Sequence, residues 1–181
     1  MIIDFGSVFS RKLEDKDVED IYSYRNDPDV YMTLGGFYKG MSREDVQQWV
    51  SYQRTNDNDM VWALVTKDED RCIGHLGLYN IDYRIGKAEI GLAIAKSHWG
   101  KGIGGRVYSG LITYAFEQLR LHRVETYNLA INKKVIKIKE NLGFKLEGVL
   151  RDFQYRDGKY LDVMIMTILE NEWQAVQKIN K

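Results

Sequence analysis

Four glycines fall within six consecutive residues of the chain: Gly100, Gly102, Gly104 and Gly105. An apolar, strand-forming run at 90–95 precedes them, and an apolar stripe at i, i+4 spacing that starts at Ile103 predicts a helix directly behind them. Glycine lets the backbone approach a ligand closely, and the first N–H groups of a helix have no partner inside it. Because these groups carry partial positive charge, the turn is suited to binding an anion, most naturally a phosphate.

Several phosphate ligands are compatible with such a turn. A Walker-type nucleotide loop requires G-x-x-x-x-G-K-[ST], which the chain does not contain. Gly100, Gly102 and Gly105 match the dinucleotide pattern G-x-G-x-x-G, with Glu125 twenty residues further on. That match is weak, because antiparallel-type strands come first and residues 96–99 separate the strand from the glycines. A role in tight turning alone is disfavoured because the turn opens a helix, so the rest of the chain must identify the ligand.

The composition bounds the class of protein. The chain has 181 residues, 44% hydrophobic and 29% charged, as in ordinary globular proteins. Positive and negative residues balance at 26 each, so no nucleic-acid partner is predicted, and no apolar run approaches the ~20 residues that cross a bilayer. The single cysteine, Cys72, is expected to be buried and not nucleophilic, and no Cys/His cluster has metal-ligand spacing. The start, MIIDFG, has no secretory pattern, so a cytoplasmic protein is predicted.

Hydrophobic periodicity and turn residues predict the elements that position the glycine turn. Strands are expected at 8–13, 60–66, 72–79, 88–95, 123–130, 144–155 and 159–169. Helices are expected at 14–26, from Ser42 onward, at 103–119, from Asn132 to a terminating Gly143, and at 170–181. The helix at 14–26 is expected to stop before Pro28, since proline disfavours helix in the residue before it. The segment 29–41 has no clear period and is interpreted as a loop.

The element order is β-α-α-β-β-β-α-β-α-β-β, without linker or repeat, so one domain over 1–181 is predicted. The strand–helix–strand crossover around the glycine turn requires two parallel strands joined right-handedly. The turns at 67–71 and at Asp157-Gly158 instead indicate hairpins and antiparallel neighbours. The expected fold is a mixed α/β sheet with helices packed on it.

At the glycine turn the chain resembles the GNAT family of acetyltransferases, in the branch of RimJ/RimL-like enzymes. The stretch from Trp99 to Gly104 stands where that family has Q/R-x-x-G-x-G/A, with tryptophan in place of the usual first residue. The resemblance continues through Asn132, 138–144 (IKENLGF) and 147–173. It implies a single α/β (α+β) domain with a mostly antiparallel sheet. A central parallel strand pair splays at the coenzyme site, with helices on both faces.

The resemblance also implies acetyl-CoA as the co-substrate and no metal. The pyrophosphate would lie on the backbone of 99–105, with the coenzyme's pantetheine arm along the strand before it. Lys101 and Arg106 would add charge, although each can equally be a solvated surface cation. Gly91 is compatible with a β-bulge in that strand. Asn132 would contact the pantetheine, act only as a helix N-cap, or do both. The expected coenzyme residues are Leu92, Ala93, Ile94, Trp99, Gly100, Lys101, Gly102, Ile103, Gly104, Gly105, Arg106 and Asn132.

Two residues are candidates for the proton transfers of acetyl transfer to an amine. Alternation places Glu89 beside Gly91 on the coenzyme strand, where it would act as general base or position a water, unless it only pairs with a nearby cation at the strand start. Lys139 occupies the position where the family has a tyrosine acid. It would protonate or stabilise the departing thiolate, or it is an inert solvated lysine and the thiolate leaves unprotonated. Backbone N–H groups at 92–94 would polarise the thioester carbonyl.

The acceptor is the least defined part of the prediction. By the resemblance, the first two helices, their loop and the hairpin around 79–84 face the acetyl group, with these candidate residues: Arg25, Tyr38, Tyr79 and Tyr83. The predicted activity is N-acetylation of a small amine, a polyamine or an amino sugar. The alternatives are a protein N-terminus as acceptor, a non-catalytic acyl-CoA sensor and a dinucleotide-dependent oxidoreductase. Exposed strand edges in the last hairpin are compatible with a homodimer.

Overall fold

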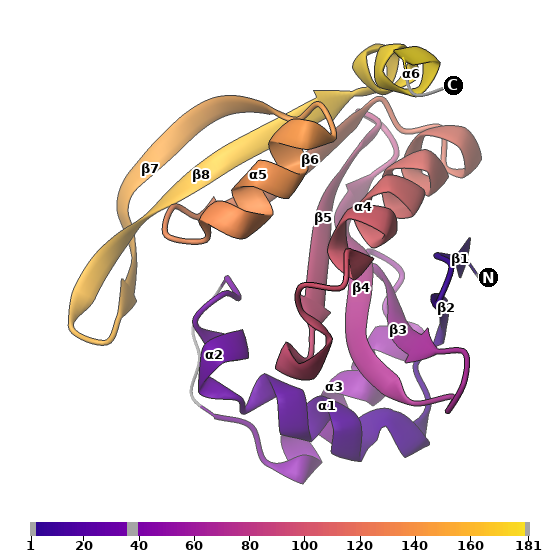
Figure 1. Ribbon diagram of the computed structural model, residues 1–181, viewed down its shortest axis with the longest axis vertical. Coiled ribbons are helices and arrows are strands. Elements are labelled where there is room, and N and C mark those ends of the chain that lie inside the picture. The colour runs from indigo at the N-terminus through magenta and orange to yellow at the C-terminus, as the bar shows by residue number, and fades with distance from the viewer. Residues whose placement is uncertain (1–2, 36–39, 180–181) are drawn as a thin grey trace.

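The computed structural model describes residues 3–35 and 40–179, and within them the strands form one mixed sheet (Figure 1). The strands are β1 (Ile3–Asp4), β2 (Val8–Lys12), β3 (Met60–Thr66), β4 (Cys72–Asp82), β5 (Lys87–Ile94), β6 (Arg123–Leu129), β7 (Lys145–Arg156) and β8 (Lys159–Leu169). Their order in the sheet is β1-β2-β3-β4-β5-β6-β8-β7. Every neighbouring pair is antiparallel except β5 and β6, which run parallel. The predicted mixed, mostly antiparallel sheet is confirmed.

Helices cover both faces of this sheet, as predicted. They are η1 (Asp15–Asp17), α1 (Val18–Arg25), α2 (Pro28–Tyr31), α3 (Arg43–Thr55), η2 (Lys96–His98), α4 (Ile103–Thr113), the π-helical η3 (Tyr114–Gln118), α5 (Lys133–Asn141) and α6 (Glu170–Ile179). One hydrophobic cluster joins α4 and α5 to one face of the strands, and a second joins α1 and α3 to the other. Successive residues of β3 alternate between the two clusters, with Trp62 and Leu64 in the first and Ala63 in the second.

The sheet opens between its two parallel strands. β5 and β6 pair only over three residues each, Lys87–Glu89 with Arg123–Glu125. Beyond this point β5 stays paired with β4 as far as Ile94, and β6 stays paired with β8 as far as Leu129. The two strands therefore diverge (Figure 1), and each keeps one backbone edge facing the opening. The predicted splayed parallel pair is confirmed.

Local signals in the sequence explain several element boundaries. The capping box predicted at the start of α3 forms, because Asp45 N donates to Ser42 Oγ and Ser42 N donates to the Asp45 carboxylate. Gly143 adopts φ 91° directly after the end of α5, as expected of a terminating glycine. Asp157 and Gly158 both have positive φ in the two-residue turn of the β7–β8 hairpin.

Two expectations about backbone shape were wrong. Pro28 opens α2 instead of preceding a loop, because a proline at the first helical position loses no hydrogen bond and Asp27 caps the helix by accepting from Asp29 N. The register between β4 and β5 is unbroken at Gly91, so no bulge lies there. The irregularity falls between Tyr79 and Asp82, where Asn80 has φ 50°.

The helix behind the glycine turn also differs from the predicted single α-helix over 103–119. Its last turn is the π-helical segment η3, and Arg120 follows with φ 56°. The apolar stripe is kept, because Leu111, Ala115 and Phe116 remain buried in the first hydrophobic cluster. The wider turn thus changes the hydrogen-bond pattern without removing the helix from the sheet.

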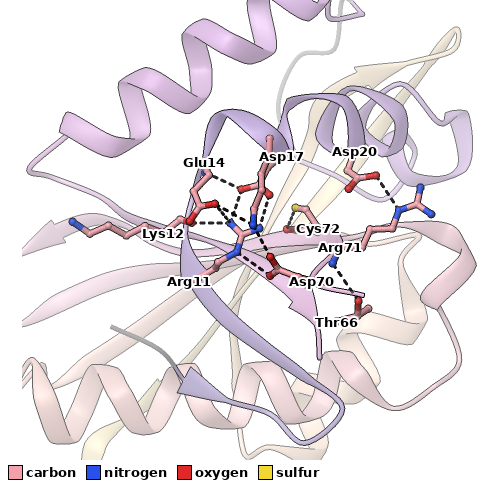
Figure 2. Close-up of polar contacts among 11 residues, drawn as sticks. Arg11, Lys12, Glu14, Asp17, Asp20, Thr66, Asp70, Arg71 and Cys72 are labelled. Carbon is pink, nitrogen blue, oxygen red and sulfur yellow. Dashed lines mark hydrogen bonds and ion pairs between the residues drawn. The ribbon is translucent and has the colours of Figure 1, made fainter. Parts of the chain in front are cut away.

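A buried ion pair fixes the start of α1 against the sheet (Figure 2). Arg11 on β2 donates two hydrogen bonds to Asp17, at 2.8 and 2.7 Å, and the Asp17 side chain is almost fully buried. Asp17 also accepts from Glu14 N at 2.8 Å.

Cys72 lies in the same region, where it donates a hydrogen bond to Gly74 O and burial raises the pKa of its thiol to about 12. It is buried, as expected, and its thiol stays protonated at neutral pH.

Candidate active site

The glycine turn has the backbone geometry of an anion site. Gly100 and Gly102 adopt φ 76° and 70°, a left-handed conformation that residues with a Cβ avoid. Gly102 is the N-cap of α4, and no side chain caps this end of the helix within the described part of the chain. Ile103 is buried and holds the first helical turn on the core. The first N–H groups of α4 are thus left for a ligand, which supports the predicted phosphate position.

The two cations predicted to assist the glycine turn differ in their surroundings. Lys101 is exposed at its tip. Arg106 is held by the N-terminal segment, because its Nε donates to Phe5 O at 2.9 Å and its Nη2 donates to Ser7 Oγ at 3.3 Å. Arg106 therefore joins residues 5–7 to α4, and its Nη1 also donates to Lys101 O in the glycine turn at 3.4 Å.

Trp99, which replaces the usual first residue of the family's loop, joins the turn to the coenzyme strand. Its Nε1 donates to Ile94 O at 2.8 Å, the last residue of β5, while the ring stays 38% exposed. Leu92 and Ile94 pack with the α4 side of the sheet, and Ala93 belongs to the α1 and α3 side. Apart from Asn132, which caps α5, the predicted coenzyme residues thus follow the open edge of β5 and continue through the glycine turn into α4.

Glu89 is the last residue of β5 that still pairs with β6. Its carboxylate accepts a hydrogen bond from Asn80 Nδ2 at 3.3 Å, and it has no ion pair among the residues that the structure describes, because Lys87 instead lies 3.5 Å from Glu125. Partial burial raises the pKa of Glu89 above its ordinary value, although the Asn80 hydrogen bond opposes this. The alternative of a simple surface ion pair for Glu89 is therefore not observed.

Glu89 lines a cavity of about 190 Å³ beside the splayed strands. The cavity is lined mainly by side chains of β6 and of the β7–β8 hairpin: Tyr127, Leu129, Phe153, Gln154 and Val163, with Gly35. The guanidinium of Arg156, at the end of β7, donates to the carbonyl oxygens of Tyr31 and Leu34. These hydrogen bonds join the β7–β8 hairpin to the end of α2 and the segment after it. One carboxylate, Glu89, thus faces a largely apolar cavity.

Lys139 is almost fully buried, only 2% exposed, on the α4 side of the opening. Its Nζ donates to Thr126 Oγ1 and to Asn128 Oδ1, the latter at 2.7 Å, and lies 4.7 Å from the centre of the Tyr108 ring. Burial lowers the pKa of this lysine to about 7, while the charge of Glu89 acts in the opposite direction. The alternative of a solvated lysine is therefore wrong for Lys139, whereas Lys137 on the same helix is exposed.

None of the candidate acceptor residues that the structure describes lines the cavity at Glu89. The Arg25 guanidinium lies 5.0 Å from the Trp49 ring centre. The ring of Tyr79 occupies the space that Gly91 leaves open, since a Cβ there would lie 2.7 Å from it. Tyr83 is 58% exposed in the β4–β5 turn and does not line the cavity at Glu89. Tyr38 lies outside the described residues.

Sequence reasoning did not single out the polar partners of these residues. Thr126 and Asn128 alternate on β6 and both face Lys139. Two polar residues at i, i+2 in an otherwise apolar strand face were the available signal. His75 was also missed, and its Nδ1 lies 2.7 Å from the Tyr24 hydroxyl. Burial and the nearby charge of Arg25 lower the pKa of His75, so it is neutral at physiological pH.

In the described residues no group of three His, Cys, Asp or Glu side chains has a metal-binding arrangement. Residues 3–35 and 40–179 also contain no helix long and apolar enough to span a membrane. Neither finding identifies a ligand for the site around Glu89.

A mostly antiparallel sheet that opens between two parallel strands, beside an uncapped helix N-terminus, is an architecture that this chain shares with solved acetyltransferases. The chain belongs to the GNAT family of acetyltransferases, because the family model described as "Acetyltransferase (GNAT) domain" matches residues 8–145. It is 32% identical over 165 residues to the uncharacterized N-acetyltransferase p20 of Bacillus licheniformis, covering 90% of this chain and 93% of that protein. The RimJ/RimL-like branch, in contrast, stays a prediction.

Two further relatives agree with this family. A crystal structure of a probable acetyltransferase has a TM-score of 0.86 and 30% identity, over 96% of this chain and 99% of that one. The spermidine N(1)-acetyltransferase of Vibrio cholerae is 27% identical over 163 residues, covering 90% of this chain and 93% of that protein. Its solved complex with CoA and spermine has a TM-score of 0.83. The protein is thus a GNAT N-acetyltransferase with the fold of coenzyme A-binding relatives.

Proposed function

We propose that this protein moves an acetyl group from acetyl-CoA to the primary amine of a small molecule, a polyamine or an amino sugar. The observation that carries the proposal is the carboxylate of Glu89, which lies at the opening of the sheet, lines a cavity and forms no ion pair with a described residue. The similarity to a spermidine acetyltransferase supports the polyamine in particular.

In this proposal the coenzyme lies with its pyrophosphate at the N-terminus of α4 and its pantetheine along the open edge of β5. Asn132 caps α5, since its Oδ1 accepts from Val135 N at 3.3 Å. In this proposal it also contacts the pantetheine. The backbone edge of 92–94 faces the opening beyond the last β5–β6 pair. The acetyl group then lies close to Glu89.

Glu89 takes the proton that the substrate ammonium must lose, directly or through a water. The amine nitrogen then bonds to the carbonyl carbon, and the carbon–sulfur bond breaks to release the thiolate. The nitrogen loses its second proton in this step, and that proton passes to the thiolate or to water, so the products are the neutral amide and CoA. The raised pKa of Glu89 suits a base that works near neutral pH better than an exposed carboxylate would. The charge of Lys139, on the other side of the opening, stabilises the thiolate while the lysine is protonated.

The proposal is tested by thiol release from acetyl-CoA in the presence of spermidine, glucosamine and a peptide with a free N-terminus. Turnover with spermidine or glucosamine is the expected result. Turnover with the peptide alone would replace the small-molecule acceptor by a protein N-terminus. Tight coenzyme binding without turnover on any amine would identify a sensor and refute the enzyme.

The role of Glu89 is tested by Glu89→Gln, with Glu69→Gln in the exposed β3–β4 turn as the matched control. Loss of the base is expected to lower kcat by about 10²–10⁴-fold. In the wild-type protein kcat/KM is expected to fall as the pH is lowered and Glu89 becomes protonated, starting at a higher pH than for an ordinary carboxylate because the pKa of Glu89 is raised. Glu89→Gln should abolish this fall. An unchanged pH profile in Glu89→Gln would remove the residue from the mechanism.

A further inference from the structure

One buried polar cluster is not fully used by the proposed mechanism. It consists of Lys139 on α5, Thr126 and Asn128 on β6, and the ring of Tyr108 on α4. All four residues are at least nine-tenths buried. The cluster contains one ionisable group, the amine of Lys139, which is positively charged while it is protonated, and no carboxylate contacts it among the residues that the structure describes. A buried charge of this kind is costly unless its surroundings compensate it.

The hydrogen bonds of Lys139 determine how the Asn128 amide is turned. An ammonium group only donates, so Asn128 must present its oxygen Oδ1 to Nζ. Two N–H groups of the ammonium serve Thr126 and Asn128, and the face of Tyr108 takes the third. Lys139 therefore has no donor to spare in this arrangement.

Asn128, in contrast, has two donors to spare. Its Nδ2 is buried and makes no hydrogen bond with any described residue, while the whole side chain is only 6% exposed. Buried donors are nearly always paired, because an unpaired one loses its bonds to water without replacement. The vacancy calls for a hydrogen-bond acceptor, and the adjacent ammonium favours an acceptor that carries or gains negative charge.

The position of Asn128 relates this vacancy to the coenzyme. Asn128 pairs with Met164 of β8 and lies three residues beyond Glu125, the last residue of β6 that pairs with β5. Its strand therefore borders the opening at this point. Glu89 lies at the start of the opening and Asn132 caps α5 just after β6 ends. Asn128 thus stands between the predicted acetyl end and the predicted pantetheine contact.

We propose that Asn128 is a catalytic hydrogen-bond donor whose Nδ2 binds the carbonyl oxygen of the acyl thioester, and that Lys139 is the positioning residue that holds this amide. The inference rests on the proposed function. When the amine nitrogen bonds to the carbonyl carbon, the oxygen takes up the electron pair of the C=O bond and its negative charge strengthens the hydrogen bond. When the carbon–sulfur bond breaks, the carbonyl reforms and the electron pair of that bond leaves with the thiolate.

This assignment gives Lys139 a role that differs from that of a proton donor. Its positive charge polarises the Asn128 amide through Oδ1 and makes the opposite N–H groups stronger donors. A residue without an N–H donor at 139 would leave Asn128 free to turn over and present its oxygen to the thioester. The replacement of the family's tyrosine by lysine thus goes together with an asparagine on the facing strand.

The experiment compares Asn128→Leu, which removes the donor at similar volume, with Thr126→Val, which removes the other partner of Lys139 and keeps the donor. The carbonyl stretch of bound [1-¹³C]acetyl-CoA is measured by isotope-edited infrared spectroscopy, together with kcat and the Kd of CoA and of acetyl-CoA. In the wild-type protein the stretch is expected below its value in water. In Asn128→Leu it should return toward that value, with kcat lower by about 10²–10³-fold and the Kd of CoA within threefold of wild type.

Thr126→Val is expected to keep the infrared shift and to lower kcat by less than tenfold. Lys139→Met should lose most of the shift while the KM for acetyl-CoA changes little, as befits a residue that acts through Asn128. A Lys139→Met protein with the full shift would overturn the positioning role.

The same infrared shift in Asn128→Leu and in wild type would overturn the donor assignment. Equal losses of affinity for CoA and acetyl-CoA would also overturn it, since they would place the amide on the pantetheine. These failures are distinct from failure of the proposed function. A wild-type protein that shows the shift but acetylates no amine refutes the function and leaves Asn128 in place, whereas a protein that binds neither ligand refutes both.

Discussion

Replacing Lys139 with methionine removes a buried charge that the folded protein holds at a cost. The lysine is 2% exposed and is bonded to two neutral oxygens, so burial lowers its pKa from the ordinary 10.5 to about 7. Methionine has a similar length and fills the space beside Tyr108 without a charge. We therefore expect the stability of the two proteins to respond differently to pH.

The sign of the effect follows from proton binding. Between pH 7 and 10.5 the unfolded chain keeps the proton on Lys139 while the folded protein has released it, so the free energy of unfolding rises with pH in this range. Below pH 7 both states are protonated and the full cost of burial is present. From the lowered pKa, the stability of wild type relative to Lys139→Met should rise by about 3 kcal/mol between pH 6 and pH 9.5.

The measurement is urea unfolding of both proteins at pH 6 and pH 9.5 at constant ionic strength. Other groups titrate over this range in both proteins, so only the difference between them is compared. Lys137→Met, on the exposed face of the same helix, is the control and should follow wild type to within about 0.5 kcal/mol. Parallel pH dependence of wild type and Lys139→Met would show that the lysine is not held in a low-pKa site and would refute the reasoning.

Three other substitutions test the fold around the site. Gly102→Ala places a Cβ at φ 70°, which should cost about 1–2 kcal/mol in unfolding free energy and weaken CoA binding at least tenfold by calorimetry; an unchanged Kd would contradict the anion site. Arg11→Met removes the ion-pair partner of the buried Asp17 carboxylate (Figure 2) and should lower the free energy of unfolding by about 3–5 kcal/mol in denaturant. The control Arg43→Met removes an exposed ion pair and should cost less than about 1 kcal/mol. Gly91→Ala would put a methyl group 2.7 Å from the Tyr79 ring and should cost about 1–3 kcal/mol; a thermal midpoint equal to that of wild type would show that the ring moves freely.

The features that the sequence determined are those set by neighbouring residues. The glycine turn, the Ser42 capping box and the Asp157-Gly158 hairpin each depend on a few adjacent side chains and on the backbone angles they allow. The parallel pairing of β5 and β6 followed because a strand–helix–strand crossover joins parallel strands. Their splaying was implied by the family resemblance. The resemblance to the family motif then predicted acetyl-CoA as the co-substrate. The alternation of side chains along β5 placed Glu89 beside Gly91 as the candidate base.

Proline shows how a local signal can still be misread. The chain does leave the helix before Pro28, as predicted, but it enters another helix at once. Asp27 supplies the cap and the missing N–H of proline is not needed in the first turn. The same residues are therefore compatible with a loop or with a new helix, and packing of Val30 in the core favours the helix.

The state of Lys139 was decided by tertiary structure alone. In the sequence it is one of several lysines in a short helix, and nothing in its neighbours separates it from the exposed Lys137. Only the folded chain brings α4 and β6 over it and supplies Thr126 and Asn128 as partners. Backbone angles are set by nearby residues, but the pKa of a side chain depends on the solvent and charge around it, and those come from segments distant in the sequence.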